Sequence, residues 1–186
     1  MRVMTDQINK LRTRLNPIIA AGITTREQEL IRSVREVTDG AMKAGQYGGS
    51  RMALGLEAVY RAELTQRGVL VWETMMQAVD GLHPYQPMEL ADDFKHFISE
   101  HLESSRKELA YALKNRSGKQ SEENETFNER FEMRELSEML LRSYGAQLDL
   151  WVIQHRTKLS EAAAKQRAKW MQKAIEWILG WWLGRK

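Results

Sequence analysis

The sequence contains no cysteine, and this absence excludes several kinds of site together. Disulfide frameworks, thiolate nucleophiles and zinc–thiolate centres all require that residue. The first ten residues also lack the apolar core of a secretory signal peptide. Because a reducing compartment agrees with both observations, we expect a cytoplasmic protein.

Proline is scarce as well, and its three positions are 17, 84 and 87. No stretch shows the alternation of apolar and polar residues that is typical of strands. Apolar residues instead recur every three or four positions almost throughout the chain, which is the helical period. The pattern predicts an all-α protein, a bundle of about four helices followed by a long C-terminal helix or two helices.

The bundle helices can be placed from their start and stop signals. The first is expected to end at Asn16-Pro17, because proline cannot continue a helix and constrains the residue before it. The second is expected to open at Thr24, where Glu27 three residues later completes a capping box. A glycine-rich break at 44–50 and the two later prolines separate the others. The expected ranges are 5–15, 24 to about 43, 51–80 and 88–115.

A polar stretch, 116–125, is expected to be an exposed linker between a helical bundle at 1–115 and a C-terminal arm at 126–186. Within the arm, the helical pattern runs from Phe127 to Leu183 without a proline. The arm is therefore predicted to be one long helix, or two helices that break near Gly145.

Motifs for chemistry are weak. Asp93 and His96 have the carboxylate-x-x-His spacing of di-iron bundles, but such sites need a second copy of the motif and two further carboxylates. We interpret His96 and Glu100 as a solvated pair one helical turn apart. The glycines before Ser50 lack the phosphate-binding pattern and a preceding strand, so a hinge is the simpler interpretation. We expect no catalytic activity, no metal or other cofactor and no small-molecule substrate.

An acidic run and a basic segment lie next to each other in the sequence. Residues 121–150 contain three basic and eight acidic residues, whereas residues 151–186 contain eight basic and two acidic residues. The glutamates have the charge to hold a divalent cation, but a straight helix does not provide the loop geometry that calcium sites need. A solvated acidic face is therefore the simpler interpretation. An antiparallel pair of chains would place the two segments side by side.

Four of the six tryptophans lie within residues 170–182. At 100° per residue they share an apolar arc of about 200°. The expected interaction surface on this arc comprises Trp170, Met171, Ala174, Ile175, Trp177, Ile178, Trp181 and Trp182. The accompanying basic residues are Lys165, Lys169, Lys173, Arg185 and Lys186.

This apolar face needs a cover. Four tryptophans in water would present about 600–1,000 Å² of aromatic surface, more than soluble monomers usually expose. The segment from Trp170 to Gly184 is about 22 Å long as a helix, too short for a hydrocarbon core of about 30 Å. Three covers remain open at this point: the chain's own bundle, another protein molecule, or a membrane surface.

The sequence therefore predicts a non-enzymatic assembly or adaptor protein that self-associates or binds a protein partner through its tryptophan-rich C-terminal helix. The alternative is a membrane-active protein, peripheral to an anionic lipid surface, with tryptophan at headgroup depth and lysine on the polar side. A nucleic-acid-binding protein is the second alternative, because cations also cluster near the N-terminus. The members of that cluster are Arg2, Lys10, Arg12 and Arg14.

Overall fold

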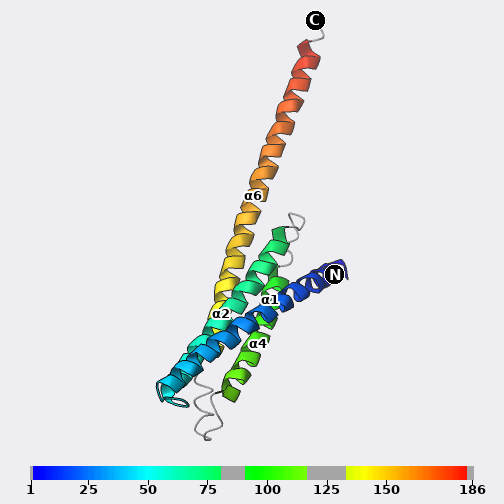
Figure 1. Cartoon of the computed structure of the whole chain (residues 1–186). Coiled ribbons are helices and arrows are strands. Elements are labelled where there is room, and N and C mark those ends of the chain that lie inside the picture. The colour runs from blue at the N-terminus through cyan, green and yellow to red at the C-terminus, as the bar shows by residue number, and fades with distance from the viewer. Residues whose placement is uncertain (1, 81–90, 117–132, 184–186) are drawn as a thin grey trace.

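The computed structural model describes residues 2–80, 91–116 and 133–183, with side chains described for 9–79, 91–116 and 133–176. Within these ranges the chain is helical apart from the connection at 44–49, and no strand occurs there. The helices are α1 (Arg2–Lys43), α2 (Ser50–Asp80), α4 (Ala91–Arg116) and α6 (Met133–Leu183). The all-α prediction is confirmed (Figure 1).

The predicted break at Pro17 is wrong, because α1 runs through it as one helix. An interior proline removes one backbone hydrogen bond and costs about 3 kcal/mol. Leu15 and Ile19 lie on either side of Pro17 and are both buried in the core, which offsets that cost. Thr24 does not cap a helix either; its hydroxyl donates to the carbonyl of Ala20 at 3.0 Å, a bond that a threonine inside a helix can make. The two predicted helices are therefore one.

The glycine-rich connection between α1 and α2 is the predicted hinge. The amide of Gln46 donates to the carbonyl of Ala41 at 2.8 Å, and that of Gly45 donates to Met42 at 3.0 Å. This pair of bonds is the Schellman arrangement at a helix C-terminus, which needs a positive φ at Gly45. Gly45 has a φ of 64° and Gly48 one of 78°, so glycine at both positions avoids the strain of a side chain.

Helix α2 is the central element of the bundle. It packs against α1, α4 and α6, and α4 packs against α6 as well. Its buried apolar side chains recur at helical spacing: Met52, Leu56, Tyr60, Leu64, Val71, Met75 and Val79. A Cβ at Gly68 would lie 3.2 Å from a methyl group of Leu102 on α4 and 3.1 Å from the hydroxyl of Tyr144 on α6. Glycine at this position thus allows three helices to approach one another closely.

A line of ion pairs crosses the core from α1 to α4. Arg67 on α2 is fully buried, and its Nε donates to Glu63 at 3.0 Å. The other oxygen of Glu63 accepts from Arg26 of α1 at 2.9 Å. Arg67 also forms an ion pair with Glu108 of α4 at 3.0 Å, although the angles there are outside hydrogen-bond geometry. One buried carboxylate therefore holds two arginines.

The first part of α6 belongs to this bundle. Its buried residues are Met133, Leu136, Ser137, Leu140, Tyr144 and Leu148. The ring of Tyr144 stacks on Trp72 of α2, with centroids 5.4 Å apart. The helix continues through Gly145 without a break, because a glycine costs only about 1 kcal/mol in a helix interior and the residues around it are anchored in the core.

These contacts bear on the expected division of the chain. Part of the segment expected as a separate arm, Met133 to Leu148, lies in the same core as α1, α2 and α4. Most of the expected linker at 116–125 is outside the described residues. Only the remainder of α6 extends past the other helices, as a single straight projection toward the C-terminus (Figure 1).

Removal of the shared carboxylate tests the ionic line. We expect Glu63→Ala to lower the free energy of unfolding by about 3–5 kcal/mol, because the fully buried Arg67 would lose the carboxylate that accepts from its Nε. Glu138→Ala on α6 removes the exposed partner of Arg134 and should cost at most about 1 kcal/mol. Urea unfolding followed by circular dichroism measures both. Equal effects of the two substitutions would contradict the role given to Glu63.

Candidate docking surface on the C-terminal helix

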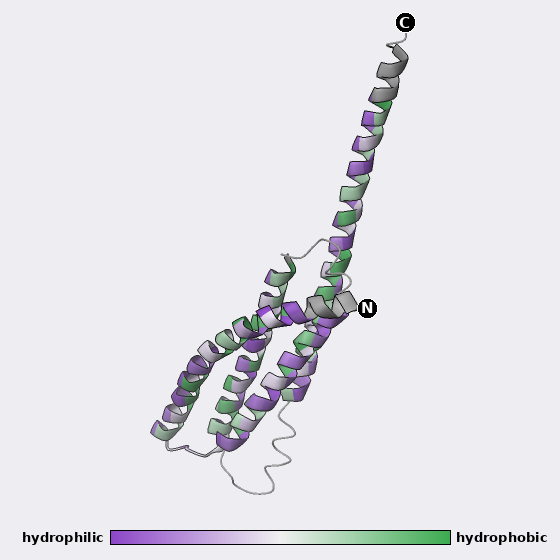
Figure 2. Cartoon of the chain, turned by 90° about the vertical axis from the view of Figure 1, so that its right-hand side faces the viewer, coloured by the Kyte–Doolittle hydropathy of each residue, from purple (hydrophilic) through white to green (hydrophobic). Residues whose placement is uncertain are grey.

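The outward side of α6 carries exposed large apolar residues along most of its length. Six of them on this helix are at least 55% exposed: Met139, Leu150, Ile153, Trp170, Met171 and Ile175. The first three lie level with the bundle or at its edge, and the last three lie on the projecting part. Figure 2 shows hydrophobic and hydrophilic residues intermixed along this projection.

These six residues share one face. At 100° per residue they fall within an arc of about 160°, whereas the buried residues of α6 occupy the opposite arc. The same helix thus has an inward face that the bundle covers and an outward face that it leaves open. We call the six residues the outward face.

The structure places the first half of the predicted tail surface on this face. Trp170 and Met171 are 68% and 65% exposed, and Ala174 and Ile175 are exposed beside them. Cover by the chain's own bundle, one of the three options, therefore does not apply to residues 170–176. Four predicted members lie in the last turns of α6, where side chains are outside those described: Trp177, Ile178, Trp181 and Trp182.

Three of the predicted basic residues lie on the projection, outside its apolar arc. Lys165, Lys169 and Lys173 are all exposed, and at 100° per residue they lie outside the apolar arc, with Lys173 60° from Trp170. Arg185 and Lys186 are outside the described residues. Arg167 differs from the lysines, because its position falls inside the apolar arc. At 100° per residue the exposed Arg142 and Arg156 fall inside the same arc, so three arginines lie among the apolar residues on this side of α6.

The structure does not assemble the other sequence motifs into a metal site among the described residues. His96 contacts Glu100 at 3.1 Å across one exposed helical turn, so the interpretation as a solvated pair is confirmed. Across the described parts of the chain, no group of three or more acidic or histidine side chains is placed to hold a metal ion. Arg12 of the N-terminal cations is engaged with Glu100 at 3.0 Å. Of the acidic run, Glu135 and Glu138 are exposed, and the more N-terminal glutamates lie outside the described residues.

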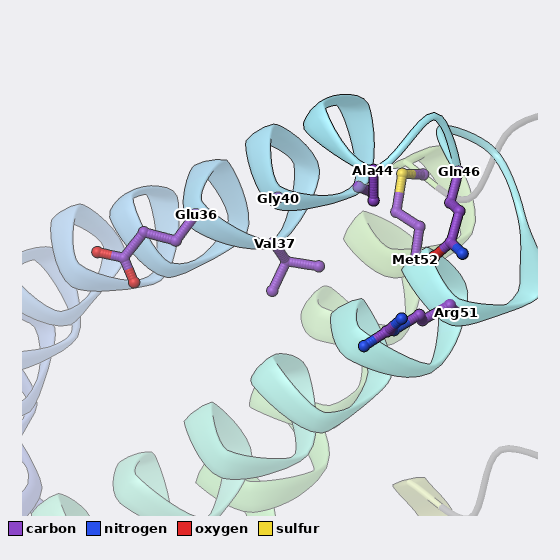
Figure 3. A pocket seen from close by; sticks show the side chains of 8 residues that line it. Glu36, Val37, Gly40, Ala44, Gln46, Arg51 and Met52 are labelled. Carbon is purple, nitrogen blue, oxygen red and sulfur yellow. The ribbon is translucent and has the colours of Figure 1, made fainter.

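A separate hollow of about 320 Å³ lies where α1 meets α2, beside the glycine-rich hinge (Figure 3). Val37 and Met52 provide apolar lining, and Glu36 and Arg51 are its charged residues. The side chain of Glu36 points away from Arg51 rather than toward it (Figure 3). The charged groups do not converge on one point, so this hollow has no arrangement for catalysis.

Sequence reasoning missed the part of the outward face that lies within the bundle. It assigned the interaction surface to the tail alone, and Met139, Leu150 and Ile153 were not singled out. The spacing contains a signal, since Leu150 follows Met139 by eleven residues, or three helical turns. That signal becomes specific only once the inward face of α6 is known.

Tyr144 sets which face is inward. It is buried between Trp72 and Gly68, and burial raises the pKa of its hydroxyl above the ordinary value, with the Glu73 carboxylate adding to that effect. The phenol is therefore neutral at pH 7 and packs as an apolar ring. Rotation of α6 would remove this ring from α2, so the outward direction of the six residues follows from this contact.

Comparison of the chain with protein-family models, with curated proteins and with solved structures finds no match. The function is therefore argued from the geometry of the chain itself.

Truncation of two nearby leucines tests whether α6 has one buried face and one exposed face. Leu148 is fully buried, so Leu148→Ala should lower the free energy of unfolding by about 2–5 kcal/mol. Leu150 is 55% exposed, and Leu150→Ala should change that free energy by about 0.5 kcal/mol or less. Chemical denaturation of both variants is the measurement. A large loss for Leu150→Ala in a monomer would mean that the outward face is part of the core.

Proposed function

We propose that this chain is a non-enzymatic helical assembly protein, in which the projecting part of α6 binds a second copy of the chain. The observation that carries the proposal is the exposure of Trp170, Met171 and Ile175 on one face of a helix that has left its bundle. The bundle provides the anchor, and the projection provides the surface.

The size of the apolar surface supports a protein interface. The four tail tryptophans together amount to about 600–1,000 Å² of aromatic surface. A standard interface buries about 800 Å² on each partner, so one tail is of the right size for one interface. Tryptophan is also among the residues most enriched at the energetic centres of such interfaces.

The position of Arg167 favours protein over lipid as the cover. Arg167 lies within the apolar arc, between the positions of Ala163 and Trp170. On an interfacial helix that guanidinium would face the acyl boundary, and a membrane offers no fixed carboxylate to it there. A protein partner can offer a carboxylate.

A membrane surface is the second candidate, and the exposed lysines of the projection favour it. Lys165, Lys169 and Lys173 would face anionic headgroups while the tryptophans occupy the interface. Over the described residues, no helix combines the length and the low charge that a membrane crossing requires. Such binding would therefore be interfacial.

Truncation tests self-association. A chain that ends at Ser160 keeps every residue of α6 that is buried among those described, and loses the tryptophan-rich part. Light scattering should give a multiple of the chain mass for the full protein and the monomer mass for the truncated one, with similar unfolding midpoints. If both are monomers, the proposal is wrong. If the truncated chain unfolds, the projection is instead part of the core.

A matched pair of charge substitutions makes this test specific to the face. Met171→Glu places a carboxylate in the apolar arc, and Gln172→Glu places the same group 100° further round the helix, outside that arc. Met171→Glu should weaken self-association at least tenfold, because the carboxylate would be desolvated at the interface. Gln172→Glu should leave the dissociation constant within about twofold. Equal effects would show that net charge, rather than the face, controls association.

Lipid titration separates the second candidate. A tail that docks on protein should show blue-shifted tryptophan emission in buffer alone and little change with vesicles. An interfacial tail should shift on addition of anionic vesicles, with the response falling as salt screens the lysines beyond a Debye length of about 8 Å. Co-sedimentation with neutral and anionic vesicles is the second readout. Strong vesicle binding by a monomeric protein would replace the proposed function with the membrane one.

A further inference from the structure

We infer that the projecting part of α6 docks antiparallel on the outward face of α6 in a second copy, at the level of that copy's bundle. This inference rests on the proposed function and adds the acceptor site and the direction of the partner. The acceptor site is the exposed stretch from Met139 to Ile153, on the side of α6 that faces away from the core.

Both ends of the outward face have large apolar residues, but a patch of small residues lies between Met139 and Leu150 at the bundle end. The projecting end has bulky residues, Trp170, Met171 and Ile175, all more than half exposed. The bundle end has a small patch, where Ala146 is exposed and a Cβ on Gly145 would meet nothing within 4 Å. Large side chains pack best on small ones, since close packing requires knobs to fill hollows.

The side chains in the first turns of the projection, from Ser160 to Ala168, are mostly small as well. A shallow hollow of about 400 Å³ lies between Ser160 and Met171. It is lined by Ser160, Ala163, Ala164, Arg167, Ala168 and Met171. Two such helices can therefore approach closely along this part of their length.

Only an antiparallel pair brings Trp170 and Met171 onto this small patch. With a two-fold axis at the level of residue 158, Trp170 lies opposite Ala146 and Met171 lies opposite Gly145, because each pair is equally distant from 158. A parallel pair would place each tryptophan beside its own copy. An antiparallel pair of identical helices also has the isologous symmetry of a closed dimer.

Charge favours the same arrangement. Residues 151–176 contain six basic and two acidic residues, so side-by-side parallel arms would repel each other. In the antiparallel register Arg167 lies opposite Asp149, nine residues on either side of the axis. The Asp149 carboxylate is 57% exposed and has one oxygen on Lys95 at 2.6 Å, which leaves its other oxygen for the partner's arginine. Of the three arginines in the arc, Arg167 thus meets an anion.

The bundle does not obstruct this docking. The other helices cover the inward face of α6, opposite the acceptor site. The outward face from Met139 to Ile175 spans about 54 Å of helix at 1.5 Å per residue, and the partner would follow this length. Each bundle would then lie at one end of a shared pair of α6 helices.

Single cysteines test this arrangement, because the chain has none of its own. Ser160→Cys lies next to the axis and should form a covalent dimer with itself when a short bifunctional maleimide is added. Arg142→Cys and Ala174→Cys lie sixteen residues on either side of the axis. Neither should link to itself, and the mixture of the two, after subunit exchange, should give at least tenfold more dimer than either alone. Ser104→Cys, exposed on α4, is the control that should stay monomeric on the gel.

Other outcomes overturn the inference in recognisable ways. Self-linking of both Arg142→Cys and Ala174→Cys would show a parallel pair. Linking of Ala174→Cys to Ala163→Cys, rather than to Arg142→Cys, would show that the projections pair only with each other. In both cases light scattering still shows a dimer, so the proposed function survives. A monomer in light scattering without any cross-link would reject the proposed function and the inference together.

Discussion

The packing of Tyr144 on α2, with Leu148 buried in the core one turn later, is the arrangement on which the rest of the structure depends. Tyr144 stacks on Trp72 and lies against Gly68, and Leu148 is fully buried one turn later. These contacts set the rotation of α6 about its own axis. Because a helix is stiff over this length, the rotation chosen in the bundle determines the direction of every side chain on the projection.

The second constraint is length. α6 has 51 residues, whereas α2 and α4 have 31 and 26, so the bundle can cover only part of it. The apolar periodicity nevertheless continues past the last buried residue, Leu148. A helix that stays apolar on one side after its neighbours have ended has a surface to cover, which is the physical reason for placing the function there.

Local sequence patterns predicted several features of the fold and misplaced two helix boundaries. The helical class, the glycine hinge and the His96–Glu100 pair followed from local patterns, since each depends on residues within about one turn of one another. Pro17 and Thr24 misled for the same reason. Their local preference to end or begin a helix is worth a few kcal/mol at most, and burial of Leu15 and Ile19 on both sides of Pro17 outweighs it.

The candidate docking surface, too, was predicted in part from the sequence and in part decided by the structure. The sequence alone predicted which residues at the C-terminal end share an apolar arc, because an angle of 100° per residue is a property of the helix itself. It could not determine that Met139, Leu150 and Ile153 are exposed, since apolar residues at helical spacing are also what a buried face of a helix contains. Only the tertiary structure decided this, because the side of α6 that α2 and α4 occupy depends on contacts between residues far apart in the chain.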